Sequence, residues 1–226
     1  MPPLASPEFS PPAPRGGVPP ALRSSASARN LPPVVASGPR GCEGSFVLSI
    51  LRFVSKRYGE RALSAVLSRL TVEHRRVFDA GVSPGTWLPF DAVCALIETI
   101  DAALGRDDLH LLADCGRAVA EDVFDQLKPR TAPEPPPELL LAEMPTFVEA
   151  MIRGVTCRLR SVGRGYGRLE LDELGAPASL TICVVVLGFL DRSLSRSGAN
   201  EVEVNLLSCR YLGDEENIYD ISWLVV

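Results

Sequence analysis

The C-terminal stretch 201–226 constrains the fold more than any other part of the chain. Apolar and polar residues alternate over 201–206 and again over 219–225, and the pattern breaks between them at Gly213. Alternation with a period of two is typical of a strand that buries one face, and a glycine between two such strands indicates a turn. The stretch therefore predicts a β-hairpin whose apolar side must be covered by other elements.

A second hairpin is predicted upstream, because 155–160 and 168–171 also alternate and flank a glycine-rich turn at 163–167. Between the two hairpins lies the almost wholly apolar segment 180–190. Its β-branched residues favour a strand, whereas the spacing of its apolar residues towards Gly198 favours a helix. We interpret it as a buried helix, and it is too short for the roughly 20 apolar residues that cross a bilayer.

The half of the chain before the first hairpin is predicted to be helical. Apolar residues recur at intervals of three and four in several segments, with glycine or proline at their ends. Pro145 is expected to start a new helix. The fold class is therefore α+β: an N-terminal helical layer packs on a C-terminal antiparallel sheet built from two hairpins with an intervening helix. The expected helices cover 45–58, 60–70, a short helix that opens at 71–73 and carries 74–76, and then 90–104, 109–127 and 138–153.

The domain boundaries follow from proline content. Residues 1–43 hold eleven of the twenty prolines and little that could form a core, so we expect a disordered tail. Its proline pairs leave open a polyproline II segment that a partner reads. Residues 44–226 are expected to form a single domain, with a proline-rich exposed loop at 128–137.

Composition excludes several functions. The net charge is −5, and the tail carries four arginines against two glutamates, so the rest of the chain is more acidic than the whole. An acidic body argues against nucleic-acid binding. No hydrolase, metalloprotease or phosphate-loop motif is present, and the glycines at 163–167 fit a hairpin turn. The N-terminus lacks the apolar core of a signal peptide, so we expect a cytoplasmic protein.

The cysteines are too widely spaced for paired metal ligands, and most lie within apolar patterns. We therefore expect reduced, mostly buried thiols and no metal site. The six residues are Cys42, Cys94, Cys115, Cys157, Cys183 and Cys209.

Six stretches of the chain carry a resemblance to a known family: Gly188-Phe189-Leu190, Ser197 to Val204, Cys209 to Gly213, Tyr219 to Trp223, Trp87-Leu88-Pro89 and Asp107 to Ala120. Through them the C-terminal half resembles the 4-vinyl reductase domain group, whose superfamily also contains TRAPP transport-particle subunits and haem-nitric-oxide-binding domains. The resemblance covers about 44–226 and is closest to a family of uncharacterised myxobacterial paralogues. At Asn217 the family tends to place a second cysteine, which argues against a ligand or redox role for Cys209.

The resemblance raises haem as a cofactor, which needs an axial histidine or another strong ligand facing a pocket. His74 lies in a charged turn, and His110 stands near the start of a helix. We therefore expect no cofactor and exclude haem, while a bound lipid is left open.

The resemblance also implies an apolar pocket between helices and sheet. Small or aromatic residues there are candidates for its lining, although tight helix packing explains the small ones equally well. These are Trp87, Cys115, Gly116, Ala120, Phe147 and Gly188. Four arginines around the first hairpin form a candidate docking face for an acidic partner or an anionic head group, with a solvated face as the alternative: Arg158, Arg160, Arg164 and Arg168.

We interpret the chain as a non-catalytic sensory or scaffolding module that binds a small hydrophobic ligand or a protein partner, including a second copy of itself. The alternative is an enzyme or accessory factor that acts on a hydrophobic, tetrapyrrole-like substrate. That alternative depends on the family name alone.

Overall fold

The computed structural model describes residues 40–106, 109–127, 135–173 and 180–225. Nearly all of the expected tail and most of the expected loop at 128–137 lie outside these residues. The helices are α1 (Gly44–Tyr58), α2 (Glu60–Arg69), α3 (Val72–Asp79), α4 (Phe90–Leu104), α5 (His110–Leu127), α6 (Pro137–Met151) and α7 (Leu180–Arg196). The strands are β1 (Gly41–Glu43), β2 (Trp87–Pro89), β3 (Ile152–Arg153), β4 (Val155–Gly163), β5 (Tyr166–Glu173), β6 (Asn200–Ser208) and β7 (Asn217–Leu224).

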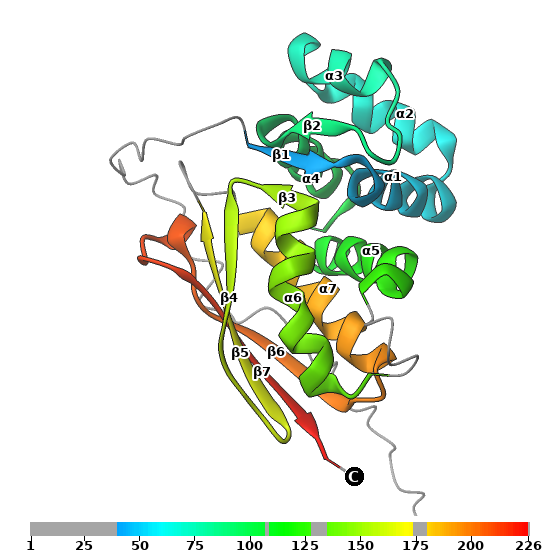
Figure 1. The fold of residues 1–226 in the computed structure, drawn as a ribbon. Helices are drawn as coiled ribbons and strands as arrows, with labels where there is room; N and C mark the ends of the chain where they lie inside the picture. Colours follow the sequence, from blue (N-terminus) through cyan, green and yellow to red (C-terminus); the bar gives the residue numbers. More distant parts are fainter. Residues whose placement is uncertain (1–39, 107–108, 128–134, 174–179, 226) are drawn as a thin grey trace, which may run out of the picture.

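A four-stranded antiparallel sheet in the order β4-β5-β7-β6 forms the C-terminal layer. The two predicted hairpins lie side by side because β5 pairs with β7, with Leu169 opposite Tyr219. One face of the sheet is buried and includes Tyr219 and Trp223. Helices α6 and α7 lie along the sheet, α5 packs against α7, and α1 to α4 gather at one end of the molecule (Figure 1). The predicted α+β class and hairpin arrangement are confirmed.

Helix α7 is the central element of the core. It confirms the helical interpretation of the ambiguous apolar segment, and Gly198 ends it with φ 89°, where the amide of Ala199 donates to the carbonyl of Leu194. A Cβ added at Gly188 would lie 2.0 Å from the carbonyl oxygen of Ala113 in α5. A Cβ at Gly116 of α5 would lie 1.9 Å from the carbonyl oxygen of Val185. The two helices therefore cross backbone to backbone.

A small second sheet, in the order β2-β1-β3, is absent from the sequence expectations. Strand β1 includes residues assigned to the tail, and its Cys42 is fully buried. Strand β2 falls in a segment to which the sequence analysis assigned no helix or strand. Strands of two or three residues are too short to show a period, so alternation cannot reveal them. The ordered domain therefore begins before residue 44.

Helix α6 continues through Pro145, contrary to the expectation that a new helix starts there. The helix also begins at a proline, Pro137, where the missing amide hydrogen costs nothing. Buried Leu140, Leu141 and Met144 lie before Pro145, so packing holds the helix on the core across the interruption. The free-energy cost of one proline inside the helix is smaller than the stabilisation gained by burying these side chains.

Among the described residues, no helix is both long and apolar enough to span a membrane.

Glu43 links the small sheet to the first helix. Its carboxylate caps α1 by accepting a hydrogen bond from the Ser45 amide at 2.7 Å, and it also accepts from the amide of Gly85. Partial burial by itself raises the pKa of Glu43, but these bonds and the Ser45 hydroxyl stabilise the charged form and lower the pKa overall.

We expect Gly116→Ala to lower the free energy of unfolding by about 2–3 kcal/mol, because the new methyl group collides with backbone that cannot rotate away. Urea denaturation of the purified chain measures this. Gly198→Ala is the control: it meets no atom within 4 Å, so its cost reflects only the positive φ and stays near 1 kcal/mol. Equal costs for the two variants would contradict the backbone contact.

We expect Glu43→Gln to cost about 1 kcal/mol at pH 7, the usual value of a helix cap. Because the folded pKa lies below the unfolded value of about 4.3, the stabilisation by Glu43 is present above that pH and is lost as the pH falls through the folded pKa. The wild-type and variant unfolding curves should therefore converge once the pH falls below the folded pKa of Glu43. Glu98→Gln on the exposed face of α4 is the control and should change little at either pH.

Candidate ligand-binding cavity

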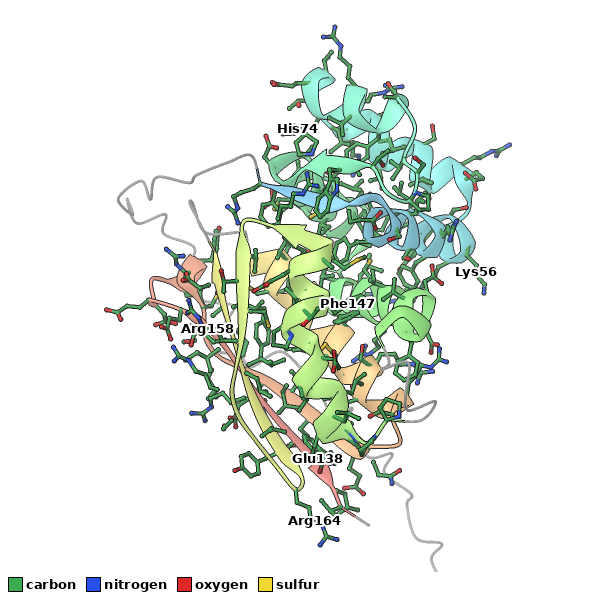
Figure 2. All side chains as sticks on the ribbon, in the orientation of Figure 1. Lys56, His74, Glu138, Phe147, Arg158 and Arg164 are labelled. Atoms are coloured by element: carbon green, nitrogen blue, oxygen red, sulfur yellow. The ribbon has the colours of Figure 1, made fainter. Side chains whose placement is uncertain are left out.

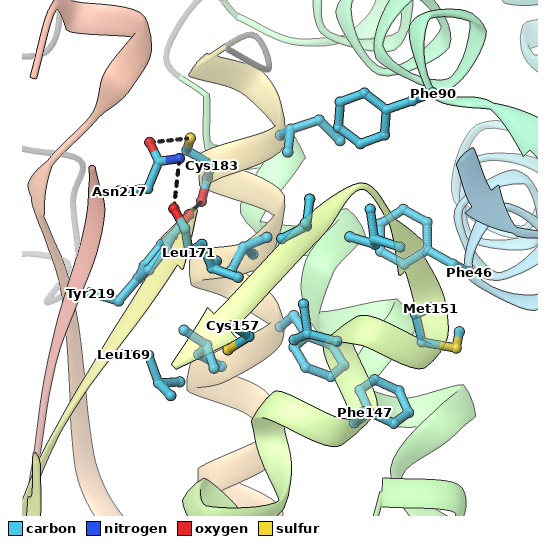
Figure 3. Close-up of a pocket in the computed structure, with 17 residues that line it drawn as sticks. Phe46, Phe90, Phe147, Met151, Cys157, Leu169, Leu171, Cys183, Asn217 and Tyr219 are labelled. Atoms are coloured by element: carbon cyan, nitrogen blue, oxygen red, sulfur yellow. Dashed lines mark hydrogen bonds between the residues drawn. The ribbon is translucent and has the colours of Figure 1, made fainter. Parts of the chain in front are cut away.

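An apolar cavity of about 50 Å³ lies between the buried face of the sheet and the helices that cover it. Strands β4, β5 and β7 form one wall, α6 and α7 form the other, and single side chains of α1 and α4 close one end (Figure 3). The lining is almost wholly carbon. It consists of Phe46, Phe90, Phe147, Val148, Met151, Ile152, Val155, Cys157, Leu169, Leu171, Ile182, Cys183, Val186, Phe189, Leu190, Asn217 and Tyr219.

Aromatic rings form the helix side of the cavity. Phe147 of α6 and Phe189 of α7 stack with centroids 5.5 Å apart and planes 5° apart, which holds the two helices in register. Phe46 and Phe90 come from the helical layer. These four rings offer flat, weakly polar surface to any molecule that enters.

The polar groups of the cavity lie at one end and are bonded to the protein. The Asn217 amide donates to the carbonyl of Leu171 at 3.3 Å and accepts from the amide of Arg210 at 3.0 Å. The Tyr219 hydroxyl donates to the carbonyl of Cys183 at 3.3 Å (Figure 3). A ligand therefore meets polar atoms that already have hydrogen-bond partners, which favours an apolar molecule.

Cys157 lies on the sheet side of the cavity and is buried. Burial, with a smaller contribution from the charge of Glu149, raises the pKa of its thiol to about 12. At neutral pH it is a protonated thiol and forms part of the apolar wall.

Of the predicted pocket residues, Phe147 lines the cavity and the other five lie elsewhere. Trp87 on β2 is half-buried, with the guanidinium of Arg153 3.7 Å from its ring centroid. Cys115, Gly116 and Ala120 are buried in α5, and Gly116 and Gly188 form the contact between α5 and α7. The alternative given for the small residues, tight packing between helices, therefore accounts for them.

Sequence reasoning missed most of the lining, because it is assembled from eight elements. The inward positions of the two hairpins were identified as buried, but period alone does not separate a residue that faces a cavity from one that faces a helix. Asn217 is the exception, since a buried polar residue in an apolar alternation is a visible signal.

The candidate docking arginines lie on or beside the face of the sheet that the helices leave open. Arg158 points away from the helices, and Arg164 is at the tip of the first hairpin (Figure 2). Arg158 and Arg160 both pair with the fully buried Glu170, at 2.8 Å for Arg158, and Arg168 pairs with Asp220 at 2.8 Å. Acidic residues that sequence reasoning did not single out therefore neutralise most of this positive charge.

No family model and no curated protein matches the chain. Solved structures do match, and they are H-NOX (haem-nitric-oxide-binding) proteins. The H-NOX protein of K. algicida has a TM-score of 0.60 and 15% identity, covering 81% of this chain and 97% of that one. The H-NOX protein of S. oneidensis in an Fe(II)NO state has a TM-score of 0.59 and 11% identity, covering 81% and 99%. A structure from a study of haem distortion in the H-NOX family has a TM-score of 0.59 and 15% identity, covering 81% and 95%. The chain therefore has the H-NOX fold.

This finding corrects one expectation. We expected no cofactor and excluded haem because of where the two histidines fall in the sequence. The solved proteins that share the fold are haem proteins. Our exclusion of haem is therefore wrong.

The residues of the cavity allow a direct test of fit to haem. His74 pairs with Asp91 at 3.6 Å in the helical layer, and His110 begins α5 on an exposed surface, so neither lines the cavity. The lining contains no basic side chain to pair with the haem carboxylates, and its volume is below the ~300–1,000 Å³ of ligand pockets. In this arrangement the lining residues do not fit haem, and we derive no chemistry through it.

We expect Glu170→Ala to destabilise the fold by about 1–3 kcal/mol, because it removes the shared partner of two neighbouring cations, Arg158 and Arg160, and leaves Arg160 only its pair with Glu216 at 3.5 Å. Their side chains are about half exposed, which keeps the cost below that of a fully buried pair. Urea denaturation measures the effect. Glu203→Ala on the exposed side of β6 is the matched control and should change stability by less than about 0.5 kcal/mol. A Glu170 variant as stable as the control would contradict the network.

Proposed function

We propose that this chain is a non-catalytic sensory module that binds a small apolar ligand in the cavity between the sheet and α6 and α7. The observation that carries the proposal is the composition of the lining: aromatic and aliphatic side chains surround the space, and its polar groups hydrogen-bond to the protein. The H-NOX fold supports it, since the solved proteins with this fold include one in an Fe(II)NO ligation state and one from a study of haem distortion.

The cavity volume limits the ligand. About 50 Å³ holds a few atoms, so either the ligand is that small or the helical wall moves outward when it binds. Binding would then stabilise one arrangement of α6 and α7, which is how a sensor converts occupancy into a change of shape.

Narrower expectations from the sequence stay proposals. They are a likeness to the 4-vinyl reductase, TRAPP and myxobacterial groups, a cytoplasmic location, a protein partner or homodimer, a disordered tail over 1–43, and an exposed loop over 128–137. The alternative of an enzyme or accessory factor acting on a tetrapyrrole-like substrate has no described catalytic group to support it, so the binding module is preferred.

Methyl-resolved NMR of the full chain under xenon tests the cavity directly, because xenon enters small apolar cavities. We expect shifts confined to methyl groups of the lining, such as those of Ile182, Leu169 and Leu171. Native mass spectrometry of freshly purified protein should also detect a retained apolar molecule.

Val186→Phe fills the cavity from α7 and should reduce the xenon-induced shifts at least tenfold. Leu187→Phe is the matched control, because it is the next residue of α7, is similarly half-buried and does not line the cavity. Equal effects of the two variants would contradict the proposal. So would a stoichiometric Soret band on adding haem, which would assign haem as the ligand.

A further inference from the structure

Two buried cysteines from distant parts of the chain face each other beside the cavity. The sulfur of Cys183 on α7 lies 3.7 Å from the sulfur of Cys209, which follows β6. Their residues are 2% and 1% exposed. Sequence reasoning treated Cys209 as lacking a second cysteine, because Asn217 occupies the family position; the structure corrects this, since α7 supplies the second sulfur.

The residues around the two sulfurs hold them close together but do not provide the ligands of a metal site. The Asn217 amide oxygen lies 3.7 Å from the Cys183 sulfur and also binds the amide of Arg210, the residue after Cys209. One side chain thus fixes the positions of both cysteines. Among the described residues, no group of three or more histidine, cysteine, aspartate or glutamate side chains could hold a metal ion.

A disulfide requires the sulfurs to approach to about 2.05 Å. The two sulfurs, now 3.7 Å apart, must therefore move closer together. Rotation of the two side chains and a small shift of the 3-10 turn Arg210–Leu212 can supply this movement. Cys183 also lines the cavity, as Cys157 does, so a small oxidant that enters the cavity can reach the Cys183 thiol.

Cys115 and Cys157 are also buried, and burial raises the pKa of each of these thiols to about 12. The feature that singles out Cys183 and Cys209 is the 3.7 Å separation of their two sulfurs. Cys94 is the cysteine that is not fully buried, which makes it the competing site for an oxidant and the natural control.

We propose that Cys183 and Cys209 form a reversible dithiol–disulfide pair that responds to a peroxide and pins α7 to the C-terminal hairpin. The Cys183 sulfur attacks one peroxide oxygen, the O–O bond breaks, and a sulfenic acid and one water form. The Cys209 sulfur then attacks the sulfenic sulfur, the S–S bond forms, the S–O bond breaks, and the hydroxyl leaves as a second water with the Cys209 proton. Two thiols are oxidised, one peroxide is reduced, and a thiol such as glutathione reverses the reaction by exchange.

The pair would act on the core directly. The link would close the segment between α7 and the end of β6, which includes all of β6, and so restrict the separation of α7 from the sheet. The proposal is independent of what the cavity binds, because its readouts are mass and linkage.

The experiment treats the reduced full chain with hydrogen peroxide in slight excess and follows intact mass and peptide maps. We expect a mass loss of two hydrogens, a cross-linked peptide that joins Cys183 to Cys209, and full reversal by glutathione. From the length of the closed loop, the melting temperature of the oxidised protein should rise by about 10 °C.

Cys183→Ala and Cys209→Ala should each abolish the mass loss, whereas Cys94→Ala should leave it unchanged. The wild-type peptide map needs no variant, so the proposal can be tested even if a core substitution fails to fold. Oxygen addition without a cross-link, a cross-link that involves Cys94, an unchanged mass, or an oxidised form that melts no higher than the reduced one would each overturn it.

Discussion

The backbone contact between α5 and α7 is the constraint on which the rest of the structure depends. Because Gly116 and Gly188 carry no side chain, the two helices approach until each backbone touches the other. That approach places α7 between α5 on one side and the sheet on the other. It directs Cys183, Val186 and Phe189 towards the sheet, where they form one wall of the cavity. The position of the cavity therefore follows from a contact that lies outside it.

The predictable part of the fold is the part that repeats. Seven helices and two hairpins follow from apolar spacing, and even the ambiguous segment of α7 is resolved by its length and its terminal glycine. The small sheet was not predicted, because its strands of two or three residues are too short to show an alternation of apolar and polar residues. The continuation of α6 through Pro145 was not predicted either. It depends on the burial of neighbouring side chains, which a rule about a single residue does not include.

The site was less predictable than the fold. Phe147 was identified, but the cavity is made by residues that only the packing of separate elements brings together. The arginines around the first hairpin suggested an open cationic face, whereas cross-strand partners such as Glu170 and Asp220 neutralise most of it. In both cases the deciding neighbour is distant in sequence, so local pattern could not reveal it.

Pro145 gives α6 a mechanical property that the other helices of the core lack. Proline has no amide hydrogen, so the carbonyl of Leu141 receives no helical hydrogen bond, and the helix can bend there without breaking one. Phe147 follows this flexible point by two residues and stacks on Phe189 at the edge of the cavity. The cavity wall therefore consists of two helical segments joined where one helical hydrogen bond is missing, with Leu140 and Leu141 buried in the segment before Pro145 and Phe147 in the segment after it.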